Sequence, residues 1–134
     1  MFKRILVSGT TTIAALTVMA STVLAAVGTQ NPNLTVSLTL DPTVVTAPGQ
    51  VTGVGTITNN TNKTNRVVAK VDVVSPSQVT STYTEKYILT AGQTVTETVV
   101  VNVSADSEKG TYTVTLSATD KKGTSWATEY VTVQ

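Results

Sequence analysis

The residues that carry most enzyme chemistry are missing from this chain or scattered along it. Histidine and cysteine are absent, which excludes Ser-His and Cys-His nucleophilic systems, zinc sites of ordinary composition and thiol redox chemistry. No glycine-rich phosphate loop or dinucleotide fingerprint is present. We therefore predict that the protein is not an enzyme and uses no cofactor and no metal. Eight carboxylates remain, and a scatter over a solvated surface explains them most simply, although two of them could meet in space as a hydrolytic pair. They are Asp41, Asp72, Glu85, Glu97, Asp106, Glu108, Asp120 and Glu129.

Four aromatic side chains are the candidates for a binding site. Trp126 and Tyr130 share one side of the last predicted strand, and Tyr83 and Tyr87 share one side of an earlier one. Residues four apart on a strand are separated by about 13 Å, so an exposed aromatic row could stack on sugar rings. The alternative interpretation is that these four aromatic side chains pack in the core or cover a sheet edge. The first interpretation makes Trp126, Tyr130, Tyr83 and Tyr87 candidate ligand-binding residues.

Two glutamates break the expected alternation. Glu97 and Glu129 fall at positions whose parity matches that of inward-facing valines. An unpaired buried carboxylate is costly, so we expect a bulge or a strand end to place each of them in water. A Lys–Asn isopeptide crosslink assisted by a buried acid is the alternative, with Lys70 and Asn102 as its candidates.

The sequence predicts that these residues lie on short β-strands. Threonine and valine dominate the region after residue 25, both favour strands, and apolar residues alternate with period two rather than 3.6. Turn signals separate the runs, which predicts an all-β Greek-key sandwich. Val44-Val45 would continue the first strand on the other sheet. We predict seven strands, over residues 34–40, 50–58, 66–74, 81–89, 94–103, 111–119 and 124–133.

Local motifs refine this arrangement. The turns over residues 47–51 and 91–95 are alike, which predicts that the second and fifth strands enter the same sheet. Gly53 and Gly55 indicate a bulge or a close approach of the backbone. Tyr112 follows Gly110 at the start of the sixth strand, where a tyrosine corner would bond backbone near the preceding turn. A core tyrosine whose hydroxyl reaches solvent is the alternative.

The first 25 residues have the pattern of a secretory signal peptide. A basic start at Lys3-Arg4 precedes an apolar stretch, and Val23-Leu24-Ala25 fits the cleavage rule, which predicts cleavage before Ala26. Residues 26–33 would then be a flexible mature N-terminus and residues 34–134 the folded domain. Losing the two cations lowers the net charge from +1 to −1. We expect no nucleic-acid or membrane partner, and Lys121-Lys122, the only remaining basic pair, marks a hairpin tip.

The turn and strand sequences resemble those of a known group. Residues 47–50 (APGQ), 56–59 (TITN), 89–95 (LTAGQTV) and 110–114 (GTYTV) are similar to the frame of bacterial extracellular immunoglobulin-like domains, of the CARDB type and the type associated with NPCBM modules in glycosidases. The resemblance covers most of residues 34–134. It implies an immunoglobulin-like sandwich that serves as a spacer, adhesion unit or accessory, and it supplies no catalytic residues.

Three functional hypotheses follow. The leading one is a secreted or cell-surface, extracellular or periplasmic domain that acts in adhesion or protein–protein interaction. The second is a carbohydrate-binding module that uses the aromatic row on a surface polysaccharide. The third is a self-assembling extracellular subunit, a homo-oligomer in which residues 26–33 pair with an edge strand of a neighbour.

Overall fold

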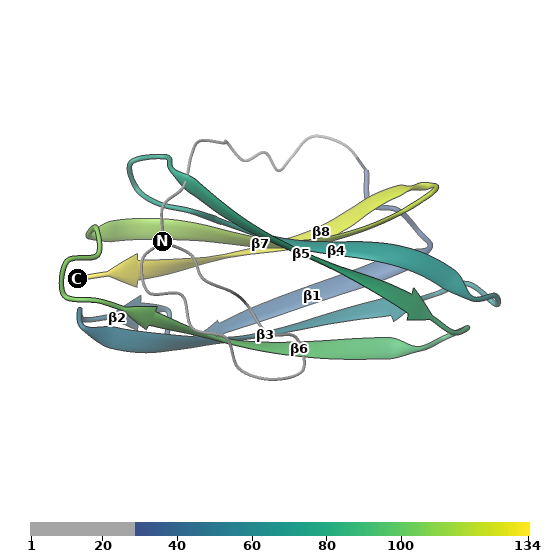
Figure 1. The fold of residues 1–134 in the computed structure, drawn as a ribbon, viewed down its shortest axis with the longest axis horizontal. Helices are drawn as coiled ribbons and strands as arrows, with labels where there is room; N and C mark the ends of the chain where they lie inside the picture. Colours follow the sequence, from purple (N-terminus) through teal and green to yellow (C-terminus); the bar gives the residue numbers. More distant parts are fainter. Residues whose placement is uncertain (1–28) are drawn as a thin grey trace.

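The computed structural model describes residues 29–134, which form eight β-strands (Figure 1). The predicted signal peptide, residues 1–25, lies outside the described residues. Within residues 29–134, no helix is long and apolar enough to cross a membrane. The strands are β1 (Leu34–Asp41), β2 (Val44–Val45), β3 (Gly49–Asn59), β4 (Asn65–Val74), β5 (Thr80–Leu89), β6 (Thr94–Val103), β7 (Gly110–Asp120) and β8 (Gly123–Val133).

The strands form two sheets, as expected for a β-sandwich. A three-stranded sheet has the order β1-β3-β6, and a five-stranded sheet has the order β2-β8-β7-β4-β5. Seven predicted strands are confirmed, each end within one residue of its prediction. The count of seven is wrong because Val44–Val45 forms an eighth strand, parallel to Thr132–Val133 of β8. The second and fifth predicted strands, β3 and β6, are neighbours in one sheet, as the similar turns indicated.

The apolar core lies between the two sheets and is formed by the inward-facing side chains of the strands. On β4, Val67, Ala69 and Val73 are buried, whereas Arg66 and Lys70 are exposed, so the period of two is confirmed there. Half-buried Val71 packs against both of the two core clusters. Their buried members are Leu34, Ile57, Val67, Ala69, Leu89, Leu116 and Ala118 in the first cluster, and Val45, Val51, Val73, Val103, Tyr112, Val131 and Val133 in the second.

The two glycines of β3 mark a close approach and not a bulge. The pairing of β3 with both β1 and β6 continues without interruption past Gly53 and Gly55. A Cβ atom on Gly55 would lie 2.5 Å from Cδ2 of Leu116 in the opposite sheet. Glycine is therefore needed at position 55 because Leu116 occupies the space that a side chain would fill.

Tyr112 forms the predicted tyrosine corner. Its side chain is 1% exposed, and its Oη donates a hydrogen bond of 2.8 Å to the backbone carbonyl of Glu108. Burial raises the pKa of the Tyr112 phenol, with a contribution from the nearby Glu108 carboxylate and a partial offset from this hydrogen bond. The bond fixes the turn between β6 and β7 to the start of β7.

Residues 29–33, the described part of the segment that was predicted to be flexible, make hydrogen bonds to the sandwich. Asn31 is 5% exposed, and its backbone N–H donates to the carbonyl of Thr124 at 3.1 Å. The buried Ser125 hydroxyl donates to the carbonyl of Asn31 at 2.8 Å. Polar groups of this segment thus have hydrogen-bond partners on β8, which composition alone does not reveal.

Candidate functional site

Trp126 and Tyr130 lie on the outer face of the five-stranded sheet. They share this face with Thr128 because the inward positions of β8 belong to Ser125 and Val131, which are buried. Tyr130 is 58% exposed, and Trp126 is half-buried. The backbone N–H of Trp126 donates to Oε1 of Gln30 at 2.8 Å, and Nε2 of Gln30 donates to the backbone carbonyl of Trp126 at 3.1 Å. These bonds join the N-terminal segment to a part of β8 that does not pair with β2.

Tyr83 and Tyr87 lie on the opposite, inner face of the same sheet. On β5 they share their parity with Ser81 and Leu89, which are buried, and they pair with the inward residues Val71 and Val67 of β4. The four aromatic residues of the predicted site are therefore not brought together on one surface. The sequence could not reveal this because alternation on β5 does not say which parity faces the core.

Tyr83 and Tyr87 instead form a cluster with two carboxylates, which we call the Tyr–Glu cluster (Tyr83, Glu85, Tyr87 and Glu97). Tyr83 Oη donates to Oε1 of Glu85 at 2.5 Å, and Tyr87 Oη donates to Oε2 of Glu97. The second bond joins β5 of one sheet to β6 of the other. It satisfies an inward carboxylate that would otherwise be costly between the sheets.

The Tyr–Glu cluster corrects the expectation for Glu97. The pairing of β3 with β6 is continuous, with Gly55 opposite Glu97, so no bulge turns this side chain into water. Burial raises the pKa of Glu97, and the hydrogen bond from Tyr87 partly offsets that increase. Burial and the hydrogen bond to Glu97 raise the pKa of Tyr87 well above its ordinary value. At neutral pH the phenol of Tyr87 therefore stays protonated and donates.

Glu129 also lies in an uninterrupted ladder, opposite Val114 of β7, and is half-buried. A bulge or strand end at this position is therefore wrong as well. The proposed isopeptide pair is not assembled. Lys70 is exposed, with Nζ 3.4 Å from the Asp72 carboxylate, while the Asn102 side chain accepts a bond of 2.9 Å from Gln50.

An apolar slot lies in the interior between the two sheets and is lined by residues of β1, β3, β4, β6, β7 and β8. The enclosed volume is about 60 Å³, and strand β6 contributes Glu97, Val99, Val101 and Val103 to its lining. Val99 and Val101 are only half-buried, because the slot leaves their inner sides incompletely packed. Strand β6 is also an edge of its sheet. The slot therefore adjoins a strand whose outer backbone edge is available for pairing.

Asp120 is held by amide side chains at the turn between β7 and β8. Its Oδ1 accepts from Nδ2 of Asn31 at 2.7 Å, and its Oδ2 accepts from Nδ2 of Asn65 at 2.9 Å and from Nδ2 of Asn33 at 3.2 Å. The Lys122 N–H donates to Oδ1 at 2.7 Å. Partial burial alone would raise the pKa of Asp120, but these four hydrogen bonds lower it below its ordinary value.

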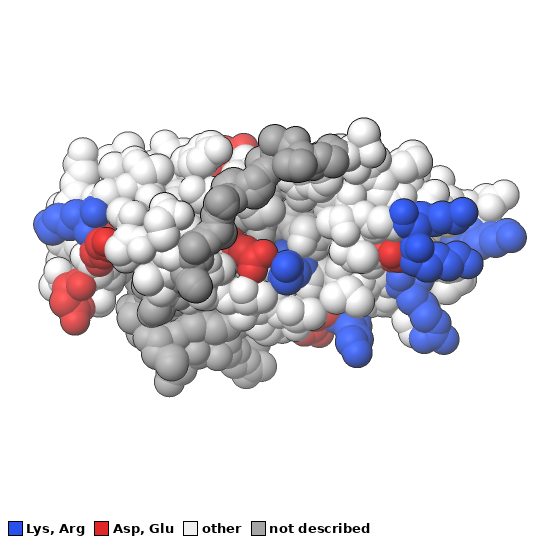
Figure 2. All heavy atoms as spheres, turned by 90° about the horizontal axis from the view of Figure 1, so that it is seen from above, with Lys and Arg blue, Asp and Glu red and all other residues white. Residues whose placement is uncertain are grey.

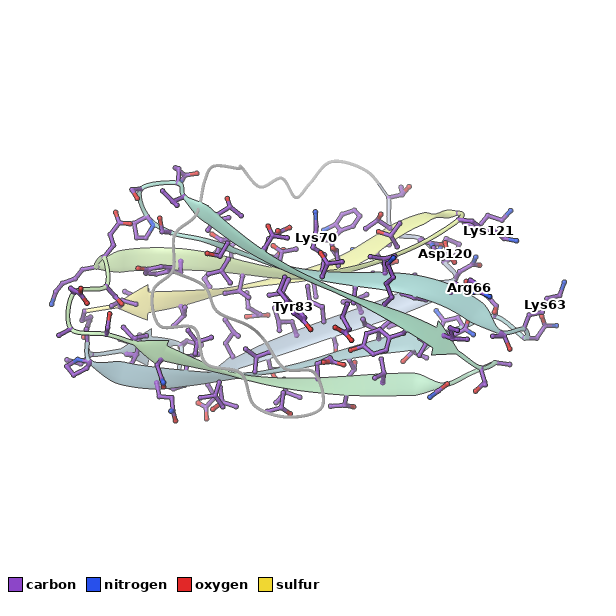
Figure 3. The ribbon with its side chains drawn as sticks, in the orientation of Figure 1. Lys63, Arg66, Lys70, Tyr83, Asp120 and Lys121 are labelled. Carbon is purple, nitrogen blue, oxygen red and sulfur yellow. The ribbon has the colours of Figure 1, made fainter. Side chains whose placement is uncertain are left out.

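Four exposed cations gather around that turn, and we call them the basic end (Lys63, Arg66, Lys121 and Lys122). Figure 3 shows Lys63, Arg66 and Lys121 at the same end of the molecule as Asp120, and Figure 2 shows Lys and Arg side chains concentrated there. The pairing of Val68 with Thr119 brings Arg66 beside the turn that carries Lys121. Only Lys121-Lys122 was recognisable from sequence, because Lys63 and Arg66 come from a distant segment.

Among residues 29–134, no group of three or more Asp or Glu side chains is placed to hold a metal ion. No model of a known protein family matches the chain, and no curated protein matches its sequence.

Solved structures show what the fold is similar to. A CARDB domain of a Pyrococcus furiosus protein, in complex with di-metal ions, matches with a TM-score of 0.57 and 14% identity over 75% of this chain and 91% of that domain. The alkylpurine DNA glycosylase AlkC of Pseudomonas fluorescens, bound to DNA containing an abasic site analog, matches with a TM-score of 0.59 and 10% identity over 76% of this chain. A β-glucosidase from Listeria innocua in complex with glucose matches with a TM-score of 0.55 and 17% identity over 75% of this chain.

These matches establish a CARDB-like, immunoglobulin-like fold. The chain spans only 30% of the glycosylase and 16% of the β-glucosidase. The match to the CARDB domain, in contrast, covers 91% of that domain. Sequence identity at this level shows the fold alone, so the specific role must be argued from the surface of this chain.

Proposed function

We propose that this chain is an exported, non-enzymatic domain that acts at the cell surface by contact with a protein. The observation that carries the proposal is that β6 is at a sheet edge and that four of its inward residues line the apolar slot. Strand β6 pairs with β3 along one side and with no described strand along the other. An incoming strand would extend the sheet through main-chain hydrogen bonds and insert alternate side chains between the sheets.

The size of the slot supports a protein partner over a small molecule. Ligand pockets usually measure about 300–1,000 Å³, whereas this slot encloses about 60 Å³. That volume suits part of one or two inserted side chains. The partner that fits is therefore an extended segment with alternating apolar residues.

Export is supported by the signal-like pattern of residues 1–25. Cells that make the whole chain should release or display a product whose mass matches residues 26–134. Recovery of only the full-length mass, and only from the cytoplasm, would refute export.

The protein contact is tested by adding a charge to the free edge of β6. Thr96 is exposed on β6, and a lysine at an edge opposes strand addition. Thr96→Lys should abolish binding of the purified domain to envelopes of the producing cells. Thr35→Lys is the matched control, because Thr35 is exposed on β1 at the other edge of the same sheet, where β1 packs near β8.

Protease treatment of the envelopes provides the second arm of this test. Loss of binding after proteolysis, together with loss in Thr96→Lys and retention in Thr35→Lys, supports strand addition to a protein. Binding that Thr96→Lys leaves unchanged would refute it.

A second candidate is carbohydrate binding through the outer aromatic residues. It is supported by Trp126 and Tyr130, which share the outer face of β8, with Tyr130 58% exposed. Tyr83 and Tyr87 are not part of this version because they face inward. The third candidate, self-assembly through residues 26–33, has less support because Asn31 and Asn33 already bind Asp120 of the same molecule.

A further inference from the structure

We propose that the outer face of the five-stranded sheet, from the basic end to Trp126, binds an anionic polysaccharide. The ligand is a sugar polymer that carries carboxylate, sulfate or phosphate groups. This inference extends the carbohydrate-binding candidate by specifying a negatively charged ligand. It is independent of the proposed protein contact, except that both place the protein outside the cell.

The cations of the basic end have no acidic partner to neutralise them. Lys63, Arg66, Lys121 and Lys122 are all exposed, and the ion pair found among residues 29–134 is elsewhere, between Lys70 and Asp72. Asp120 lies at the same end and makes no ion pair with these cations. Its carboxylate, which accepts from three amide side chains and a backbone N–H, offsets only one of the four positive charges. The domain therefore keeps a local excess of positive charge although its mature net charge is −1.

Strand register connects the basic end to Trp126. Lys70, Ser117 and Trp126 lie on one row across β4, β7 and β8. Arg66 lies four residues before Lys70 on β4, a distance of about 13 Å along the strand. Exposed Lys86, on β5 opposite Val68, lies between these two rows. An extended polymer could thus contact cations at one end and stack a sugar ring on Trp126 at the other.

The chemistry of the surface favours a polysaccharide over other polyanions. A domain with net charge −1 lacks the overall basic character of nucleic-acid-binding proteins. Threonine hydroxyls are frequent on this face, with Thr119 and Thr124 paired at 2.8 Å beside the basic end. Hydroxyl groups of this kind can exchange hydrogen bonds with sugar hydroxyls. Ile88 is the exposed apolar residue opposite Arg66, so an anionic membrane is the competing ligand to test.

The experiment uses the intrinsic fluorescence of the purified mature protein. Trp126 is the only tryptophan of the chain, so its emission reports a ligand at the proposed site. Heparin is the probe, and neutral dextran is its uncharged control. Heparin should quench or shift the emission at low salt. Added NaCl should weaken binding progressively, because the protein displaces counterions from heparin when it binds and a higher salt concentration opposes their release. No change with heparin, or an equal change with dextran, would overturn the proposal.

Charge-reversal variants locate the site. Lys121→Glu should weaken heparin binding at least about tenfold, because it replaces one attractive contact by a repulsive one. Lys109→Glu carries the same change in net charge, and Lys109 lies on the turn between β6 and β7 instead of the turn between β7 and β8. It should stay within about twofold of the parent. Equal losses in the two variants would show that net charge alone acts and would overturn the site.

Two further ligands separate the competing interpretations. Anionic phospholipid vesicles or single-stranded RNA that bind more tightly than heparin under the same conditions would overturn the assignment to a polysaccharide. Thr96→Lys should bind heparin like the parent protein because β6 belongs to the other sheet. A failure of the protein-contact proposal therefore leaves this measurement unaffected.

Discussion

Replacing Tyr112 by phenylalanine tests the tyrosine corner. The substitution removes one hydroxyl from a side chain that is 1% exposed, and with it the 2.8 Å hydrogen bond to the Glu108 carbonyl. A hydrogen bond of this type contributes about 1 kcal/mol net, and a carbonyl left unpaired raises the loss toward about 2 kcal/mol. The ring itself remains, so no cavity larger than the lost oxygen is formed.

The expected loss converts into a measurable change in melting temperature. Unfolding entropy is about 2.1 cal/mol/K per residue, or roughly 0.23 kcal/mol/K for the 109 residues of the predicted mature chain. A loss of about 1–2 kcal/mol therefore lowers the Tm by about 4–9 °C. Thermal unfolding followed by circular dichroism, supported by urea titration, measures both quantities.

Tyr130→Phe is the matched control for this experiment. Tyr130 is 58% exposed, so loss of its hydroxyl should change the stability by less than about 0.5 kcal/mol. Equal melting temperatures for Tyr112→Phe and Tyr130→Phe would refute the claim that the hydroxyl of Tyr112 fixes the turn between β6 and β7.

Three further substitutions test the core and the Tyr–Glu cluster. Gly55→Ala should cost about 1–3 kcal/mol in urea titration, because its Cβ would meet Cδ2 of Leu116 at 2.5 Å; an unchanged midpoint would refute this contact. Asn59→Ala should lower the free energy of unfolding by about 3 kcal/mol or more in the same assay. The reason is that the fully buried Asn59 side chain donates to three backbone carbonyls and accepts two hydrogen bonds. A loss below about 1 kcal/mol would contradict this role of Asn59. Glu97→Gln should flatten the pH dependence of stability. The pKa of Glu97 is raised in the folded state, so the folded chain keeps this proton up to a higher pH than the unfolded chain does. The free energy of unfolding therefore falls as the pH rises from the ordinary pKa of a glutamate through the raised value. Melting curves between pH 3 and pH 8 measure this, and identical pH profiles for the parent and Glu97→Gln would contradict it.

The sequence predicted the strands well because their signal is local. Most of the seven predicted strands are rich in β-branched residues and are bounded by turn residues, and β6 was predicted with the ends that the structure shows. Tyr112 was also predictable, since its partner Glu108 lies only four residues away. The two-residue strand β2 was suggested only as a continuation of the first strand, because its pairing partner is at the other end of the chain.

The candidate sites were not predictable in the same way. Alternation on β5 established that Tyr83 and Tyr87 share a face, but only the sandwich shows that the face is the inner one and that Glu97 of β6 lies opposite Tyr87. Glu97 was expected in water because a partner from the other sheet has no signature near it in the sequence.

By itself, the sequence determined that this chain forms strands, that the strands pack as a sandwich, and that histidine and cysteine chemistry is absent. These properties depend on composition and on a period of two, both of which are local. Only the tertiary structure decided which surfaces exist. It brought Lys63 and Arg66 to the turn that carries Lys121, and it left β6 as an edge beside an apolar slot. The reason is that strand pairing joins residues far apart in the chain, and no local pattern encodes those contacts.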